Sequence, residues 1–254
     1  MRKVLIPIVA VVLTLAVHAD GRAQTQRTSL HISNGSGAAV DTYLTLGADS
    51  AGRIGDVRLV DVSTNQPVQV EDVDPGQHLQ GRFRLNAGQT VSWDSFGGQR
   101  ATGAVTFRAF PQSCPTANGP CGVTKGEFAI NLGNEAVDIS SVDGINAIMA
   151  MDLSDGGATP WPSGPGGSKV AQNSGTVEGD QPLWGVFPYR CTICAGIGNA
   201  PGGDCNPPNP LGPPNQSYCK TGTEANPQPA LCQLNRSGAG GTVKFTFIEA
   251  KDPM

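Results

Sequence analysis

Apolar and polar residues alternate along the chain in short runs, and residues that favour turns separate the runs. The runs lie at residues 29–33, 40–46, 56–62, 68–73, 82–85, 89–93 and 103–110. Alternation with a period of two is typical of half-buried strands. Runs that follow one another at roughly 8–12 residues, with Gly, Pro, Asn and Asp between them, indicate an all-β sandwich or barrel.

Two further runs, residues 127–132 and 136–140, are expected to pair as a hairpin whose turn is residues 133–135. Alternate residues of a strand share one face, so Glu127 lies on the face opposite the apolar residues of its run. Asp138 likewise lies opposite the apolar residues of the second run. The pattern therefore predicts a half-buried hairpin that carries acids on its polar face.

The carboxylates of this hairpin are the candidate functional residues. Asp143 follows in an Asp-Gly turn signal, so Glu127, Asp138 and Asp143 stand close together along the chain. Acids set among apolar strand residues cost free energy unless they are partnered or exposed in a cleft. We therefore expect function to reside here. The alternative is that Asp138 and Asp143 brace turns through hydrogen bonds to the backbone.

The first 23 residues predict an export signal. Arg2 and Lys3 precede an apolar run at residues 4–17, and small residues lead up to Ala23. This pattern is typical of a secretory signal peptide, with cleavage after Ala23 preferred over cleavage after Ala19. The apolar run is shorter than the about 20 residues that span a bilayer. We therefore expect a secreted or periplasmic protein, and the alternative is an uncleaved N-terminal anchor.

Composition narrows the range of partners and cofactors. The chain has 34 Gly and 20 Pro, and only 15% of its residues are charged, which favours a turn-rich extracellular β protein. Its formal net charge is −4, and an acidic chain with few basic clusters is a poor candidate to bind nucleic acid or an anionic membrane. The sequence has no phosphate loop, dinucleotide fingerprint or His-Glu-x-x-His motif. We therefore expect no cofactor and no metal.

Seven cysteines in an exported protein indicate disulfides. They are Cys114, Cys121, Cys191, Cys194, Cys205, Cys219 and Cys232. Cys114 and Cys121 stand apart from the others and close a short loop, so we expect these two to pair. The pairing of the other five is open, and their odd number leaves one thiol over.

The domain organisation follows from where the apolar alternation stops. Residues 156–240 are rich in Gly and Pro and then in Cys, with little apolar mass, and they predict a disulfide-stapled excursion. A clean alternation at residues 241–248 predicts a strand that returns to the main sheet. The β-sandwich domain then comprises residues 24–155 and 241–254, after the signal peptide at residues 1–23.

Three stretches of the sequence resemble the sequence motifs of a known family. Leu30-His-Ile-Ser-Asn34 opens the first strand, and a Leu-x-x-Gly strand entry begins at Leu85. The most recognisable motif is Asp138-Ile-Ser-Ser-Val-Asp143-Gly-Ile-Asn146. Together, over about residues 29–153, these motifs resemble the thaumatin-like proteins. The resemblance implies a flattened β-sandwich with an acidic cleft, in a family that includes β-1,3-glucan binders, weak glucanases and antifungal proteins.

The resemblance carries the acids of the family's cleft onto Glu127, Asp138 and Asp143. The arginine of that cleft is not matched, and only Lys125 or Arg108 could replace it. The disulfide that ties the first strand to the last in the family is also absent, and residues 156–240 replace its helix-rich second domain. A further cleft aspartate would be either Asp152 or Asp155.

These observations lead to three functional hypotheses. In the first, a secreted thaumatin-like protein binds a polysaccharide or cell-wall glycan of the β-1,3-glucan type through Glu127, Asp138, Asp143 and Asn146. In the second, it is a weak glycoside hydrolase with Glu127 as general acid and Asp138 or Asp143 as the partner. In the third, it is a non-catalytic secreted structural or surface protein. The sequence gives no oligomeric state.

Overall fold

The computed structural model describes residues 26–108, 123–141, 144–157, 159–176, 183–187, 220–221 and 231–251. The predicted signal peptide, the Cys114–Cys121 loop and Asp143 lie outside these residues, as do Cys191, Cys194, Cys205 and Cys219. Cys232 is buried and takes part in a disulfide. The predicted pairing of the other cysteines stays a prediction.

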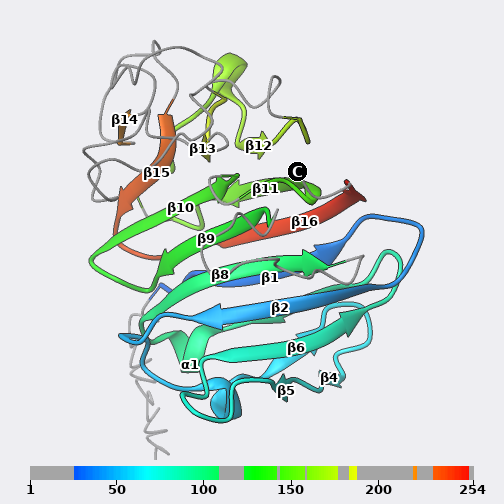
Figure 1. The fold of residues 1–254 in the computed structure, drawn as a ribbon. Coiled ribbons are helices and arrows are strands. Elements are labelled where there is room, and N and C mark those ends of the chain that lie inside the picture. The colour runs from blue at the N-terminus through cyan, green and yellow to red at the C-terminus, as the bar shows by residue number, and fades with distance from the viewer. Residues whose placement is uncertain are drawn as a thin grey trace, which may run out of the picture.

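Two β-sheets face each other in the part of the chain that the structure describes (Figure 1). One has seven strands, in the order β12 (Val170–Gln172), β11 (Ala147–Ser154), β16 (Thr242–Ala250), β1 (Ser29–Asn34), β7 (Thr90–Trp93), β3 (Leu59–Asp61) and β4 (Pro67–Val68). The other has nine, with the path β14 (Lys220–Thr221), β15 (Leu231–Ser237), β10 (Asn134–Ser140), β9 (Lys125–Ile130), β8 (Ala101–Arg108), β2 (Val40–Leu46), β6 (Gln80–Leu85) and β5 (Glu71–Asp72). The ninth strand, β13 (Val186–Phe187), pairs with β10. The all-β class predicted from the sequence is confirmed.

Three short helical turns lie between the strands along the described part of the chain. They are η1 (Ile54–Asp56), α1 (Ser95–Gly98) and η2 (Pro165–Gly167). Among the described residues, no helix has both the length and the apolar character needed to span a membrane.

Most of the strands predicted from alternation are present, with the predicted faces. In β2 and β9, for example, buried residues alternate with partly exposed ones along the whole strand. The closing strand is also confirmed, because β16 runs parallel to β1 and pairs Phe247 with Asn34. The N- and C-terminal strands therefore lie side by side in the seven-stranded sheet.

Two predicted strands differ in the structure. The run at residues 56–62 is a strand only from Leu59, because the carboxylate of Asp56 accepts a hydrogen bond from the N–H of Arg53 (3.0 Å) and closes the turn of η1. The run at residues 68–73 is split between β4 and β5, which belong to different sheets. This run buries no residue, so no apolar face holds it to one sheet.

Parts of the predicted excursion belong to the sheets. Strand β12 pairs with β11, and both β13 and β15 pair with β10. These pieces of residues 156–240 therefore extend the sandwich, and Figure 1 shows β15 and β13 beside β10.

A glycine brings the two sheets close together behind the candidate site. Gly126 in β9 faces inward, and a Cβ atom at this position would overlap the ring of Phe245 in β16. Phe245 is completely buried. Since protein cores are close-packed, this contact fixes how β9 lies against the opposite sheet.

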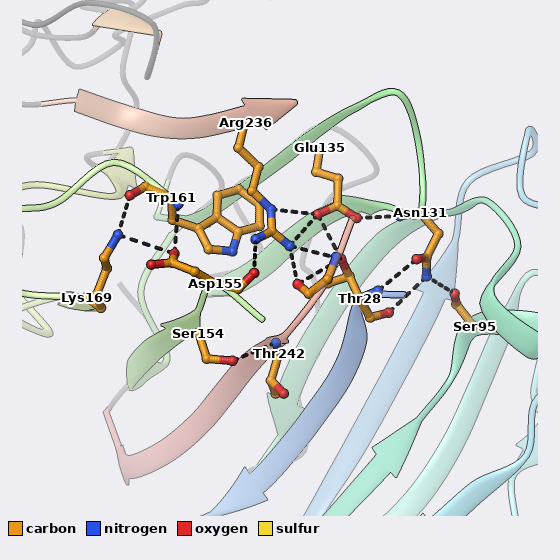
Figure 2. A network of polar contacts seen from close by, with 11 residues as sticks. Thr28, Ser95, Asn131, Glu135, Ser154, Asp155, Trp161, Lys169, Arg236 and Thr242 are labelled. Carbon is orange, nitrogen blue, oxygen red and sulfur yellow. Dashed lines mark hydrogen bonds and ion pairs between the residues drawn. The ribbon is translucent and has the colours of Figure 1, made fainter. Parts of the chain in front are cut away.

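A buried polar network anchors the β9–β10 hairpin at its turn (Figure 2). Glu135 in β10 and Arg236 in β15 pair across the sheet and form an ion pair of 2.7 Å, with both side chains fully buried. Thr28, just before β1, donates its hydroxyl to Glu135 (2.8 Å) and accepts a hydrogen bond from Arg236 (3.0 Å). Asn131 accepts from the N–H of Thr28 (2.8 Å) and donates its own N–H to Glu135 (2.6 Å).

The same network corrects the predicted turn of the hairpin. Glu135 was expected in the turn, but β10 begins at Asn134 and Glu135 is a buried strand residue. The turn comes earlier because Asn131 has a φ of 57°, in the left-handed region that Asn tolerates better than most residues. The chain therefore reverses at residues 131–133.

Candidate functional site

Glu127 and Asp138 lie directly opposite each other on the antiparallel strands β9 and β10. In such a pair the Cβ atoms are about 4.5–5.5 Å apart, so the side chains meet on one face of the sheet. Here the two carboxyl groups form a hydrogen bond to each other. The structure thus brings together two of the three acids that the sequence singled out.

Asp138 is the buried member of this carboxyl pair. Its residue is only 3% exposed, and its Oδ1 atom is buried with no hydrogen-bond partner in the part of the chain that the structure describes. Glu127 is partly exposed on the same face. The pair therefore has one side chain inside the protein and one that reaches its surface.

The surroundings of the carboxyl pair favour the protonated form of Asp138. Burial, which penalises the charged form, raises the pKa of Asp138 well above its usual range, and the negative charge of Glu127 and the hydrogen bond with it raise this pKa further. A hydrogen bond between two carboxyl groups also requires one of them to be protonated, because a carboxylate only accepts. Asp138 lies in the middle of β10, and its carboxyl group contacts the side chain of Glu127 rather than the backbone of a turn.

Polar residues extend from the carboxyl pair across the outward face of the nine-stranded sheet. Lys125 lies two residues before Glu127 on β9, so both side chains share this face. The strand pairing continues the row of Lys125 through Thr106 in β8 and Tyr43 in β2 to Arg82 in β6. Arg82 donates hydrogen bonds to Glu71 in β5 and to Tyr43. We call this face, centred on Glu127 and Asp138, the outer face.

Sequence reasoning named Lys125 and Arg108 as substitutes for the arginine of the thaumatin-like cleft. Lys125 shares the outer face with Glu127, while Arg108 lies at the end of β8 opposite Asp41. Tyr43 and Arg82 were missed. The alternation in the sequence predicts that Tyr43 and Arg82 each lie on a polar face. Only the order of the strands shows that they lie in one row with Lys125.

Asn146 is part of the fold at the edge of this region. Its Oδ1 atom accepts a hydrogen bond from the N–H of Thr124 (2.9 Å), and its Nδ2 atom donates to the carbonyl of Phe107 (2.8 Å). Asn146 is only 5% exposed. Its amide therefore holds together the chain before β9, the end of β8 and the start of β11.

The other acids named from the sequence do not join the carboxyl pair. Asp152 lies on the seven-stranded sheet, where it forms an ion pair with Lys244 (2.9 Å). Asp155, in the loop after β11, accepts hydrogen bonds from the N–H of Trp161 (2.8 Å) and from Lys169 (3.3 Å). Asp143 lies outside the described residues. Within the described ranges, no three His, Cys, Asp or Glu side chains gather in a way that could hold a metal ion.

Comparisons with known proteins give a remote structural likeness. No protein-family model matches the chain, and no curated protein matches it significantly. Solved structures do match, and one of them is a thaumatin-like xylanase inhibitor. The match covers 87% of this chain and 99% of the inhibitor, at 15% sequence identity and a TM-score of 0.33. The chain is thus only remotely similar to this thaumatin-like protein.

Proposed function

We propose that this protein binds a polysaccharide on its outer face, around the Glu127–Asp138 carboxyl pair. The observation that supports this proposal is the pair itself, in which a buried acid with a raised pKa lies beside a partly exposed acid. Sugar hydroxyls both donate and accept hydrogen bonds, as does a singly protonated carboxyl pair. The two chemistries therefore match without requiring a charged ligand.

The outer face has the length and the side chains for a chain-like ligand. Five strands, from β10 to β6, lie side by side, and at about 4.8 Å per strand they span roughly 19 Å. Lys125 adds hydrogen-bond donors, and Tyr43 adds an aromatic ring with a polar tip. The predicted signal peptide would deliver the protein to the compartment that holds cell-wall glycans. We take a β-1,3-glucan as the first ligand to test, because the motif resemblance implies this class.

The geometry of the carboxyl pair favours binding over hydrolysis. Retaining glycosidases hold two carboxyl groups about 5–5.5 Å apart, and inverting ones about 6.5–9.5 Å apart. Glu127 and Asp138 are hydrogen-bonded to each other, whereas both mechanisms hold their two carboxyl groups apart on either side of the reacting sugar. A hydrolase mechanism would therefore need a different second carboxylate.

A sedimentation assay tests the proposal. The mature protein is mixed with insoluble β-1,3-glucan, cellulose, xylan or chitin at pH 5, and both the bound protein and the released reducing sugar are measured. We expect β-1,3-glucan to retain the protein without sugar release. Glu127→Ala should weaken retention at least tenfold. The control Asp152→Asn, which removes an exposed acid of the other sheet, should bind like the parent.

Other outcomes of this assay contradict the proposal. Retention by none of the four polysaccharides, or equal retention of Glu127→Ala, would leave the structural-protein hypothesis in its place. Sugar release that disappears in Glu127→Gln would replace binding with hydrolysis.

A further inference from the structure

We propose that the Glu127–Asp138 pair is a proton switch, which holds the polysaccharide while the two carboxyl groups share a proton and releases it when that proton is lost. This inference rests on the proposed function and adds its regulation. It is carried by three features of the described residues: the opposed positions of the two acids, the burial of Asp138 and its unpartnered oxygen.

The backbone prevents the two acids from moving apart. They are opposed by the register of β9 and β10, and the pairing on both sides of them continues from Ala129–Ala136 to Lys125–Ser140. On the inner side, Gly126 lies against the ring of Phe245, so β9 has no space to retreat. Two negative charges created here would therefore stay in contact.

The described strands beside Asp138 place uncharged residues next to it. On the outer face, β8 places the uncharged Ala104 opposite Glu127 and Thr106 opposite Lys125. On the other side, β13 and β15 bring Phe187 and Asn235 next to β10. Besides the pair itself, the charged or titratable side chains that the structure describes on this face are Lys125 of β9, Asp41 and Tyr43 of β2, Arg82 and Arg84 of β6, and Glu71 of β5.

The Oδ1 atom of Asp138 makes ionisation more costly for Asp138 than for Glu127. This atom is buried and has no hydrogen-bond partner in the described part of the chain. An ionised carboxylate needs hydrogen bonds on both oxygens when it is removed from water. Loss of the proton would therefore bring like-charge repulsion together with an unsatisfied buried charge.

Ligand binding and proton binding are then coupled. A polysaccharide that covers Glu127 removes water from the exposed member of the pair and raises the cost of a second charge still further. By linkage, a ligand that prefers the protonated pair also raises the affinity of the pair for its proton. The protein is expected to hold its ligand at acidic pH and to release it as the pH rises.

The test follows the proton and the ligand on the same sample. The mature chain is labelled with ¹³C, and the carboxyl carbon signals are followed by NMR from pH 3 to pH 9. Asp138→Asn assigns the signal of Asp138 by its disappearance, and Glu127→Gln should move the midpoint of that signal to lower pH. The Kd for soluble β-1,3-glucan is measured over the same pH range.

Ordinary carboxyl groups titrate near pH ~4, and we expect the midpoint of the Asp138 signal to lie above this range. As the pH rises past this midpoint, the Kd should begin to increase. The increase should be at most tenfold per pH unit, because one proton is lost. Asp152→Asn should leave both curves unchanged. If Asp138→Asn fails to fold, the shift caused by Glu127→Gln still assigns the signal.

Three results would overturn the switch while binding itself stands: a constant Kd, a Kd whose midpoint differs from that of Asp138, or an Asp138 signal in the ordinary range. Absence of binding at every pH is a different failure, because it removes the proposed function and the switch together.

Discussion

A single buried aspartic acid sets the chemistry of the outer face. Asp138 is only 3% exposed, and both this burial and its partner Glu127 raise its pKa and so favour its uncharged form. The alternation of the runs was enough to predict that both acids lie on one face of a hairpin. Their direct contact and the orphaned Oδ1 could not be predicted, since they depend on the register of the two strands.

The raised pKa of Asp138 predicts how stability depends on pH. A carboxyl group with a raised pKa in the folded state stabilises the fold fully below the unfolded pKa of about 3.9, and this contribution is lost as the pH rises through the folded pKa. The free energy of unfolding should therefore fall with pH over this window, by up to about 1.4 kcal/mol per pH unit. Asp138→Asn should remove this slope.

Urea denaturation at pH 4, 5.5 and 7 measures the effect. The matched control is Asp152→Asn, because Asp152 forms an exposed ion pair that contributes little. An equal slope in the parent and in Asp138→Asn would contradict a raised pKa of Asp138.

The Glu135–Arg236 pair is a second buried charged site, with a structural role. Arg236 packs over the ring of Trp161, 4.1 Å from its centroid, and donates to the carbonyl of Asp155 (3.1 Å). It also donates to the carbonyl of Gly240. Because Glu135 and Thr28 lie 101 and 208 residues away from Arg236 along the chain, no local pattern in the sequence could reveal this pair.

Breaking this pair should be far more harmful than replacing it. Arg236→Met leaves the Glu135 carboxylate buried and unpaired, and such a change costs about 3–5 kcal/mol of unfolding free energy. The double variant Glu135→Leu with Arg236→Met should recover part of that loss, because it leaves no uncompensated charge. Thermal and urea unfolding of the three proteins gives the comparison. A double variant as unstable as the sum of its singles would show that the hydrogen bonds to Thr28 and Asp155 matter more than the charges.

The hairpin β9–β10 is the element that presents the site. Its faces were predictable from a period of two, and its antiparallel pairing is confirmed. Its turn was misplaced, because the left-handed φ of Asn131 is supported by the distant Thr28 rather than by a local Gly or Pro signal. The runs that failed to form regular strands, such as residues 68–73, lack a buried apolar face.

Gly126 should be the glycine on which this hairpin depends. A methyl group at Gly126 would overlap the buried ring of Phe245, so Gly126→Ala is expected to cost about 1–3 kcal/mol through overpacking. Gly133 in the turn of the same hairpin is the matched control, because a Cβ there meets nothing within 4 Å and its φ is not left-handed. Gly133→Ala should change the free energy of unfolding by less than about 0.5 kcal/mol.

Chemical denaturation of both variants tests this contrast. Equal stability of Gly126→Ala and Gly133→Ala would mean that the core yields at Phe245 and that β9 can move away from β16. Such a movement would also remove the constraint that keeps Glu127 and Asp138 in contact.

The molecule as a whole is a two-sheet sandwich whose first and last strands pair in parallel. The all-β class and the return of the C-terminal strand were predictable from alternation and turn residues. The order of the strands was not predictable, because the apolar alternation within a strand does not depend on which distant strand it pairs with. That order assembles the outer face, since it sets β9 between β10 and β8 and continues the polar row to β6.

The central claim is that a polysaccharide binds on this outer face at the carboxyl pair. The most direct measurement is a backbone amide NMR titration of the mature, ¹⁵N-labelled protein with β-1,3-glucan oligosaccharides at pH 5. We predict that the largest shift changes lie in β9 and β10 around Glu127 and Asp138 and continue into β8 and β2, with little change in β11 and β16. Shift changes confined to the seven-stranded sheet, or none at saturating oligosaccharide, would contradict the account.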